Sequence, residues 1–289
     1  EILPTPLTAA EKDEIDKAVD AAKRSDVAVV FLGDQTTSFK RPGPLTVGED
    51  SSRTSLDLPG RQLDLLKAVY ATGKPVVLVL INGRPMSINW AVKNIDGIIE
   101  TWFPGGHGGP AIADVLFGDY NPGGKLTSTF PKTVGQIPFN FPSKPNAQWE
   151  GEASRVNGAL YYFGHGLSYT TFGYSNLRIT PSQQTTNGNI TVSCDVKNTG
   201  SRTGDEVVQL YTRDVVSSVI TYEKNLRGFE RITLKPGETR TVSFTLTPTD
   251  LELLDINMNW IVEPGRFNVM IGSSSQDIRL RGDFEIVGS

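Results

Sequence analysis

Residues 75–85 read PVVLVLINGRP, a continuous apolar run followed by a turn. An apolar run without alternation is typical of a strand that is buried on both faces, as the strands of parallel sheets are. Gly83 and Pro85 favour a turn, so the strand is expected to end before Asn82. This stretch therefore predicts a central strand of a parallel sheet with a loop at its carboxyl end.

Two more apolar runs flank this strand in the sequence. AVVFL, which begins at Ala28 and ends before Gly33, is also expected to be buried on both faces, and GIIETWF begins at Gly97. Because parallel strands need crossover connections, the order predicts helices on both faces of the sheet. The predicted fold of residues 1–135 is an α/β sandwich with a mostly parallel central sheet.

The helices that would cover this sheet carry recognisable start and stop signals. Thr8 and Glu11 form a capping box ahead of EKDEIDKAVDAAKRSD. A second helix is expected between Pro59 and Gly73, and a third carries AIADVLFG after the glycines of residues 105–109.

From Tyr174 the pattern changes to short alternating runs such as NITVSCDVKNTG and RFNVMIGSS, separated by turns such as Pro264-Gly265. This spacing predicts an all-β sandwich over residues 174–289. Cys194, the one cysteine, falls on the inward face of an alternating strand and is expected to be a buried structural thiol. Residues 136–173 are rich in Pro, Gly and aromatics and are interpreted as an ordered connecting segment.

Composition excludes several classes of protein. Of 289 residues, 38% are hydrophobic and 21% charged, which is typical of a folded protein. A net charge of −4 with scattered Lys and Arg argues against a nucleic-acid partner. No apolar window approaches the length of a transmembrane helix, so no membrane partner is expected. The chain opens with Glu1, and we interpret it as a processed product or a segment of something longer.

Three loops are expected to meet at the carboxyl edge of the sheet, where ligands bind in open parallel sheets. They cover residues 33–59, 82–85 and 104–109. The third, PGGHGG, is an alternative phosphate cradle, but it contains no phosphate-binding motif, and glycines that let a helix approach the sheet are the stronger interpretation. The two histidines, His107 and His165, fit neither a metal motif nor a catalytic triad, so we expect no metal and no cofactor.

The first loop carries the sequence GEDSSRTSLDLP from Gly48. Glu49 follows a glycine on a long loop and is a candidate general acid. The structural alternatives are that Glu49 pairs with Arg53, or that Asp50 and Ser51 cap a turn. A second catalytic carboxylate is not evident from the motifs of this chain.

These motifs, taken in order, resemble a known enzyme family. GEDSSRTSLDLP, VVLVLINGRP, DVLFGDYNPGGKL and FGHGLSYTTF are similar to segments of the glycoside hydrolase family 3 β-glucosidases, especially the periplasmic type, over nearly the whole chain. The family's architecture implies a (β/α)8 barrel, then an α/β sandwich, then a fibronectin type III-like domain. This chain matches the second and third parts only.

The resemblance implies roles for residues of the first two loops. Glu49 would be the acid/base that overhangs the barrel pocket, with Asp34 or Asp50 as alternatives. Arg53, Asn82 and Arg84, together with Asp34 and Asp50, would bind substrate or orient the loop, or would simply pack the loops together. The aspartate nucleophile would lie on the missing barrel.

The function implied is that of the C-terminal portion of a retaining, exo-acting β-glucosidase that removes terminal β-D-glucosyl residues. Its partners would be β-glucosides or cello-oligosaccharides and a (β/α)8 barrel domain or chain, and a homodimer is allowed. Its location would be secreted or periplasmic. The alternative is a carbohydrate-binding or interaction module without catalysis, or a brace for interdomain packing.

Overall fold

The computed structural model describes residues 5–35, 46–47, 53–145 and 156–288. The chain divides into two compact units. Unit 1 comprises Glu1–Ala113 and Phe130–Ile137, and unit 2 comprises Asp114–Thr129 and Pro138–Ser289. The domain boundaries at 135 and 173 drawn from the sequence stay predictions.

Unit 1 is built on a three-stranded parallel sheet in the order β1-β2-β3. The strands are β1 (Ala28–Gly33), β2 (Val76–Ile81) and β3 (Gly97–Glu100). The central strand β2 is the PVVLVLI run, and its Leu78, Val79 and Leu80 have no exposed surface. The predicted parallel sheet is confirmed.

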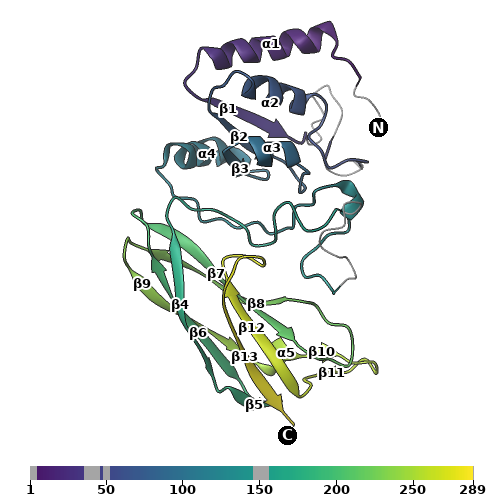
Figure 1. Cartoon of the computed structure of the whole chain (residues 1–289), viewed down its shortest axis with the longest axis vertical. Helices are drawn as coiled ribbons and strands as arrows, with labels where there is room; N and C mark the ends of the chain where they lie inside the picture. Colours follow the sequence, from purple (N-terminus) through teal and green to yellow (C-terminus); the bar gives the residue numbers. More distant parts are fainter. Residues whose placement is uncertain (1–4, 36–45, 48–52, 146–155, 289) are drawn as a thin grey trace. The chain divides into compact units, whose positions relative to one another are not determined.

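The helices of the first half are α1 (Ala9–Lys23), α2 (Gln62–Tyr70), α3 (Asn89–Asn94) and α4 (Gly108–Phe117). The Thr8 and Glu11 capping box of α1 is present. The crossover helices α2 and α3, labelled in Figure 1, touch through Tyr70 and Trp90, whose rings are in edge contact with centroids 5.4 Å apart. Right-handed crossovers between sequential parallel strands put both helices on the same face of the sheet.

This arrangement corrects the expected burial of β1. Val29 is 40% exposed and Phe31 is 53% exposed, so the strand is not buried on both faces. The reason is its position, because β1 is an edge strand and these two side chains alternate away from Leu32, which is buried. No described part of the chain covers them to the extent that the apolar run predicted.

Unit 2 contains the predicted all-β sandwich. Its two main sheets have the strand orders β5-β13-β12-β7-β8 and β4-β6-β9. The strands are β4 (Phe172–Thr180), β5 (Gln183–Thr185), β6 (Ile190–Asn198), β7 (Gly204–Asp214), β8 (Asn225–Leu234), β9 (Thr239–Leu246), β12 (Gly265–Gly272) and β13 (Ile278–Val287), with a hairpin of β10 (Leu253–Leu254) and β11 (Trp260–Ile261). Alternate residues of β6, including Cys194, are fully buried in the core, which confirms the prediction that Cys194 is a buried structural thiol.

Short helical segments complete the described structure, namely η1 (Gly105–His107), η2 (Val134–Gln136) and α5 (Pro248–Leu251). Within unit 2, the backbone at Leu126 is paired with the segment of Gly164 and His165, since Leu126 N donates to His165 O and Gly164 N donates to Leu126 O, each at 2.8 Å. None of the helices described here is long and apolar enough to cross a membrane.

Candidate functional site

The carboxyl ends of the three parallel strands place polar residues along one edge of the sheet. Asp34 follows β1, Asn82 follows β2, and Glu100 is the last residue of β3. Two contacts join them, since Asp34 N donates to Ile81 O at 2.8 Å and Asn82 Nδ2 donates to Glu100 Oε2 at 3.3 Å. The sequence-based expectation that the loops after β1 and β2 share this edge is met by the geometry.

Gly33 is needed for the approach of β1 to β2 at this point. Its φ is +143°, and a Cβ there would lie 1.9 Å from the backbone oxygen of Ile81. Any other residue would push the strand ends apart. The glycine therefore lets the end of β1 lie directly against Ile81, and this places Asp34, the next residue, at the edge of the sheet.

The Asp34 carboxylate is buried and ion-paired. Its side chain has no exposed surface, and Arg53 Nη1 lies 3.0 Å from Asp34 Oδ1. On its other oxygen, Gly83 N donates at 3.5 Å and Arg84 Nε lies 4.0 Å away. Arg53 also donates through Nη2 to Asp57 O at 2.6 Å. The pair thus joins the end of β1 to the returning part of the first loop.

Asn82 ties the second loop together. Its side chain is fully buried, and Nδ2 donates to Arg84 O at 2.8 Å as well as to Glu100. Asn82 Oδ1 is buried and accepts no hydrogen bond from the part of the chain that is described. The side chain therefore works mainly as a bridge between backbone and carboxylate at this edge.

Glu100 is a member of this cluster that the sequence analysis did not single out. Burial raises the pKa of its carboxyl to about 7, although hydrogen bonds from Trp102 N and from Asn82 act in the opposite direction. It lies inside the run GIIETWF, where it looked like one polar residue in an apolar strand. Glu100 is the last residue of β3 and pairs with Leu80 of β2, so its place at the carboxyl end of a parallel strand is the feature that could have identified it.

An apolar contact holds Val47, in the middle of the first loop, on the second loop. Val47 is 8% exposed, and a Cβ placed at Gly83 would lie 2.6 Å from Val47 Cγ2 and 2.7 Å from Phe103 Cε2. Gly83 thus leaves just enough room for both side chains to cover it. Phe103 itself is 45% exposed at this edge.

Glu49 and Asp50, two of the predicted site residues, lie outside the described residues. The chain on either side of residues 48–52 is fixed at the carboxyl edge, by Val47 on Gly83 and by Arg53 on Asp34.

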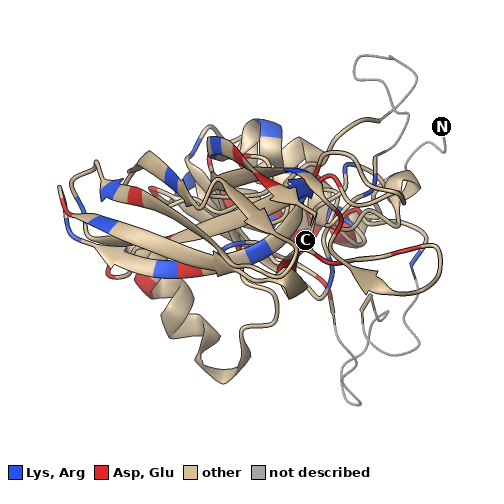
Figure 2. Ribbon diagram, turned by 90° about the horizontal axis from the view of Figure 1, so that it is seen from below, with Lys and Arg blue, Asp and Glu red and all other residues tan. Residues whose placement is uncertain are grey.

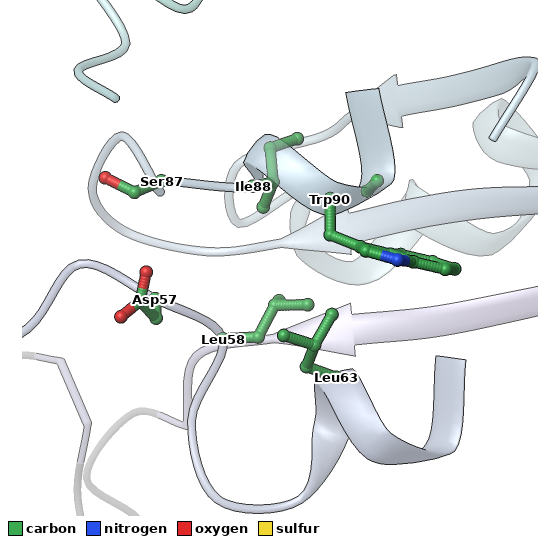
Figure 3. Close-up of a pocket in the computed structure, with 7 residues that line it drawn as sticks. Asp57, Leu58, Leu63, Ser87, Ile88 and Trp90 are labelled. Atoms are coloured by element: carbon green, nitrogen blue, oxygen red, sulfur yellow. The ribbon is translucent and has the colours of Figure 1, made fainter. Parts of the chain in front are cut away.

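A small cavity lies next to the returning part of the first loop. It has a volume of about 30 Å³ and is lined mainly by Leu58, Leu63, Ile88 and Trp90, with Asp57 and Ser87 at one side (Figure 3). Ser87 N donates to Leu56 O at 2.9 Å beside it. This is room for about one water molecule, so the cavity marks loop packing rather than a sugar site.

The remaining polar candidates do not form a second site. His107 is exposed, and His165 stacks on Tyr161 with ring centroids 4.9 Å apart. In the described parts of the chain, no three His, Cys, Asp or Glu side chains gather in a way that could hold a metal ion. Lys and Arg are interspersed with Asp and Glu along the strands of unit 2 (Figure 2).

Comparison with known proteins gives two domain matches. Residues 5–169 match the glycosyl hydrolase family 3 C-terminal domain, and residues 206–275 match the fibronectin type III-like domain.

Two curated relatives and one solved structure show the extent of the similarity. A β-xylosidase of Formosa agariphila is 47% identical over 92% of this chain, and a periplasmic β-glucosidase of Salmonella typhimurium is 45% identical over 94%. The crystal structure of the β-glucosidase of Listeria innocua in complex with glucose matches 98% of this chain with a TM-score of 0.87 and 32% identity. This chain spans 36% of the length of each of the two curated relatives and 39% of the Listeria chain.

Proposed function

Because the chain belongs to glycosyl hydrolase family 3, with a family 3 C-terminal domain followed by a fibronectin type III-like domain, we propose that it is the C-terminal portion of a retaining, exo-acting β-glucosidase. It supplies the acid/base loop, and a (β/α)8 barrel in the same or another chain supplies the aspartate nucleophile. The substrates are β-glucosides or cello-oligosaccharides, and the location is secreted or periplasmic. A homodimer stays a prediction.

One observation carries this proposal. The described chain on both sides of residues 48–52 is held at the carboxyl edge of the sheet, through Val47 against Gly83 and through Arg53 against Asp34. The described residues on both sides of the segment that carries Glu49 are thus anchored where the loops after β1 and β2 meet. A segment that served only as a connection would not need a buried ion pair at one end and a tight apolar contact at the other.

The proposed mechanism is double displacement at the anomeric carbon. The barrel aspartate forms a bond to that carbon as the glycosidic bond breaks, and Glu49 gives its proton to the leaving oxygen. Glu49 then takes a proton from water, which attacks the anomeric carbon and releases the aspartate. Retention requires the two carboxyl groups to be about 5–5.5 Å apart, so the loop and the barrel must meet closely.

The described residues divide the remaining roles. Asp34 suits a loop-orienting role better than an acid role, because Arg53 engages its buried carboxylate. Asn82 and Arg84 hold the second loop, through Asn82 Nδ2 to Arg84 O. Asp50 remains the alternative acid.

The test uses this chain alone and as part of a complete enzyme. In a chimera, the chain replaces the matched part of the periplasmic β-glucosidase of Salmonella typhimurium. We expect no hydrolysis of 4-nitrophenyl β-glucoside by the purified chain and clear hydrolysis by the chimera. The β-xyloside is measured beside it, since both kinds of relative are known. Turnover by the chain alone, or an inactive but folded chimera, would contradict the proposal.

A second candidate function is binding of sugar by unit 2 without catalysis. It is favoured by Trp260, which is 67% exposed on β11, since exposed aromatic rings can stack on sugar rings. Isothermal titration of the chain with cellohexaose, repeated with Trp260→Ala, decides this. Binding that Trp260→Ala abolishes supports it, and no heat of binding removes it.

A further inference from the structure

Glu100 makes two contacts that join separate turns of the carboxyl edge. Its Oε1 accepts a hydrogen bond from Trp102 N at 2.9 Å, and its Oε2 accepts one from Asn82 Nδ2 at 3.3 Å. The first contact belongs to the turn after β3, and the second to the turn after β2. Both oxygens of the carboxylate are therefore acceptors in this arrangement.

The turn after β3 needs such support. Trp102 has a φ of +50°, a left-handed conformation that is unfavourable for a residue with a bulky side chain. Such strain persists only where the surroundings fix it, and it often occurs at functional sites. The hydrogen bond from Trp102 N to Glu100 and the ring contact of Trp102 with Phe130, 5.9 Å between centroids, fix it here. The same turn carries Phe103 onto Gly83.

The turn after β2 depends on the other oxygen. Asn82 is fully buried and bridges Glu100 to Arg84 O. The next two residues reach Asp34, through Gly83 N at 3.5 Å and Arg84 Nε at 4.0 Å. A continuous set of contacts thus runs from Glu100 through this turn to the Asp34 and Arg53 pair.

We propose that Glu100 is a positioning residue for glycosidic cleavage, which fixes the two turns against which Val47 and Arg53 are held. The inference rests on the proposed function. Glu100 does not touch substrate in this role, because it acts through Asn82 and Trp102. The pKa of the Glu100 carboxyl is raised mainly by burial, as expected for a carboxyl group that is enclosed at this edge.

The choice of variant follows from the hydrogen bonds. Glu100→Gln keeps the size of the side chain but offers only one oxygen. Its amide NH2 must then face either Trp102 N–H or the Asn82 NH2 group, and both of these are donors. Turning the Asn82 amide over would place its oxygen against Arg84 O, so the hydrogen bond to Arg84 would be lost instead. One of the two turns therefore loses its acceptor. Asp96→Asn is the matched control, because Asp96 is exposed and lies just before the amino end of the same strand.

The first measurement is amide hydrogen exchange on the 289-residue chain. In Glu100→Gln, we expect the amides of the turn that loses its acceptor, either Gly83 and Arg84 or Trp102, to exchange at least about tenfold faster, while those of β2 keep their protection. Asp96→Asn should leave all of them unchanged. Unchanged exchange at these three amides in Glu100→Gln would overturn the inference, whatever the enzyme assay gives.

The second measurement is steady-state hydrolysis of the β-glucoside by the chimera, with rates corrected for the folded fraction. Positioning predicts that Glu100→Gln lowers kcat by about tenfold or more and changes KM by less than about threefold. A residue that matters only for stability would leave the corrected kcat unchanged, and that result would overturn the inference.

The two proposals can fail separately. If the folded chimera is inactive, the proposed function fails, and the exchange data alone decide whether Glu100 fixes the two turns. If the chimera is active and Glu100→Gln matches Asp96→Asn in both kcat and exchange, only the role of Glu100 fails.

Discussion

Arg53 Nη1 lies 3.0 Å from Asp34 Oδ1, and the Asp34 side chain has no surface exposed to solvent. The two residues are far apart in the sequence, on either side of the segment that carries Glu49 and Asp50. Their contact closes the first loop on the edge of the sheet. A buried ion pair at this place holds Arg53 against the end of β1, since each partner is costly to bury without the other.

The pair predicts strong coupling between Asp34 and Arg53. Arg53→Ala leaves a buried carboxylate with Arg84 Nε 4.0 Å away, and we expect it to lower the free energy of unfolding of unit 1 by about 3 kcal/mol. The double variant with Asp34→Ala should cost clearly less than the sum of the single variants. The measurement is urea unfolding followed by amide exchange in unit 1. Asp13→Ala, which breaks the exposed pair with Lys17, is the control and should cause no measurable change. Additive single effects would show that the contact carries no energy.

Glu100 predicts a pH dependence of stability. Its pKa is raised from 4.5 to about 7 in the folded protein, so the folded state binds more protons than the unfolded state between these values. The contribution of Glu100 is therefore present in full below about pH 4.5 and is lost as pH rises to about 7, by an amount of order 3 kcal/mol. The measurement is the free energy of unfolding of unit 1 between these pH values.

The comparison that isolates this contribution is between the chain and Glu100→Gln. Asp214 of unit 2 titrates in an overlapping range, because burial raises its pKa to about 6, so a single profile would mix the two groups. The difference between the two proteins should flatten above about pH 7. A difference that does not change with pH would mean that Glu100 titrates normally.

Sequence patterns predicted the parts of the fold that depend on local chemistry. The run at β2 and the capping box at Thr8 follow from periodicity and hydrogen-bonding chemistry, and both are present. The edge that gathers Asp34 and Asn82 followed from the parallel order of the strands, since parallel strands end at the same edge. These are consequences of neighbours in the chain or of topology.

The features that were missed depend on tertiary packing. Helix α3 has only 6 residues, too few for a helical period to be evident. The exposure of Val29 and Phe31 depends on which faces of an edge strand are covered, and an apolar run does not encode this. Glu100 was hidden for the same reason, because its two partners, Asn82 and Trp102, are set by the pairing of β2 with β3 and by a left-handed turn.

A larger residue at Gly83 is expected to disturb the packing of Val47 of the first loop on the turn after β2. In Gly83→Ala, the new Cβ would lie 2.6 Å from Val47 Cγ2 and 2.7 Å from Phe103 Cε2, so both side chains must give way. Because a β-branched side chain has few χ1 rotamers, Val47 cannot easily turn away from the new methyl group, and we expect the whole residue to shift. The expected loss is about 1–3 kcal/mol from the free energy of unfolding. Hydrolysis by the chimera should fall as well.

The control for this variant is Gly106→Ala. Nothing lies within 4 Å of a Cβ at Gly106, so stability and activity should stay as they are. Equal behaviour of the two variants in unfolding and hydrolysis would show that the contact between Val47 and Gly83 is loose and does not hold the first loop in place.

Glu49 predicts a dependence on the leaving group in the chimera. Glu49→Gln removes the proton donor, so cleavage of an alkyl glucoside, whose leaving oxygen needs protonation, should slow by about 10²–10⁴-fold. Cleavage of the bond to 2,4-dinitrophenol should slow far less, because that leaving group departs without a proton. Azide, which attacks the anomeric carbon without a general base, should restore turnover of the activated substrate and yield a β-glucosyl azide. Glu14→Gln, an exposed change on α1, is the control. Small and equal losses for both substrates, without any effect of azide, would transfer the acid role to another carboxylate, and Asp50→Asn would then be measured against the same two substrates.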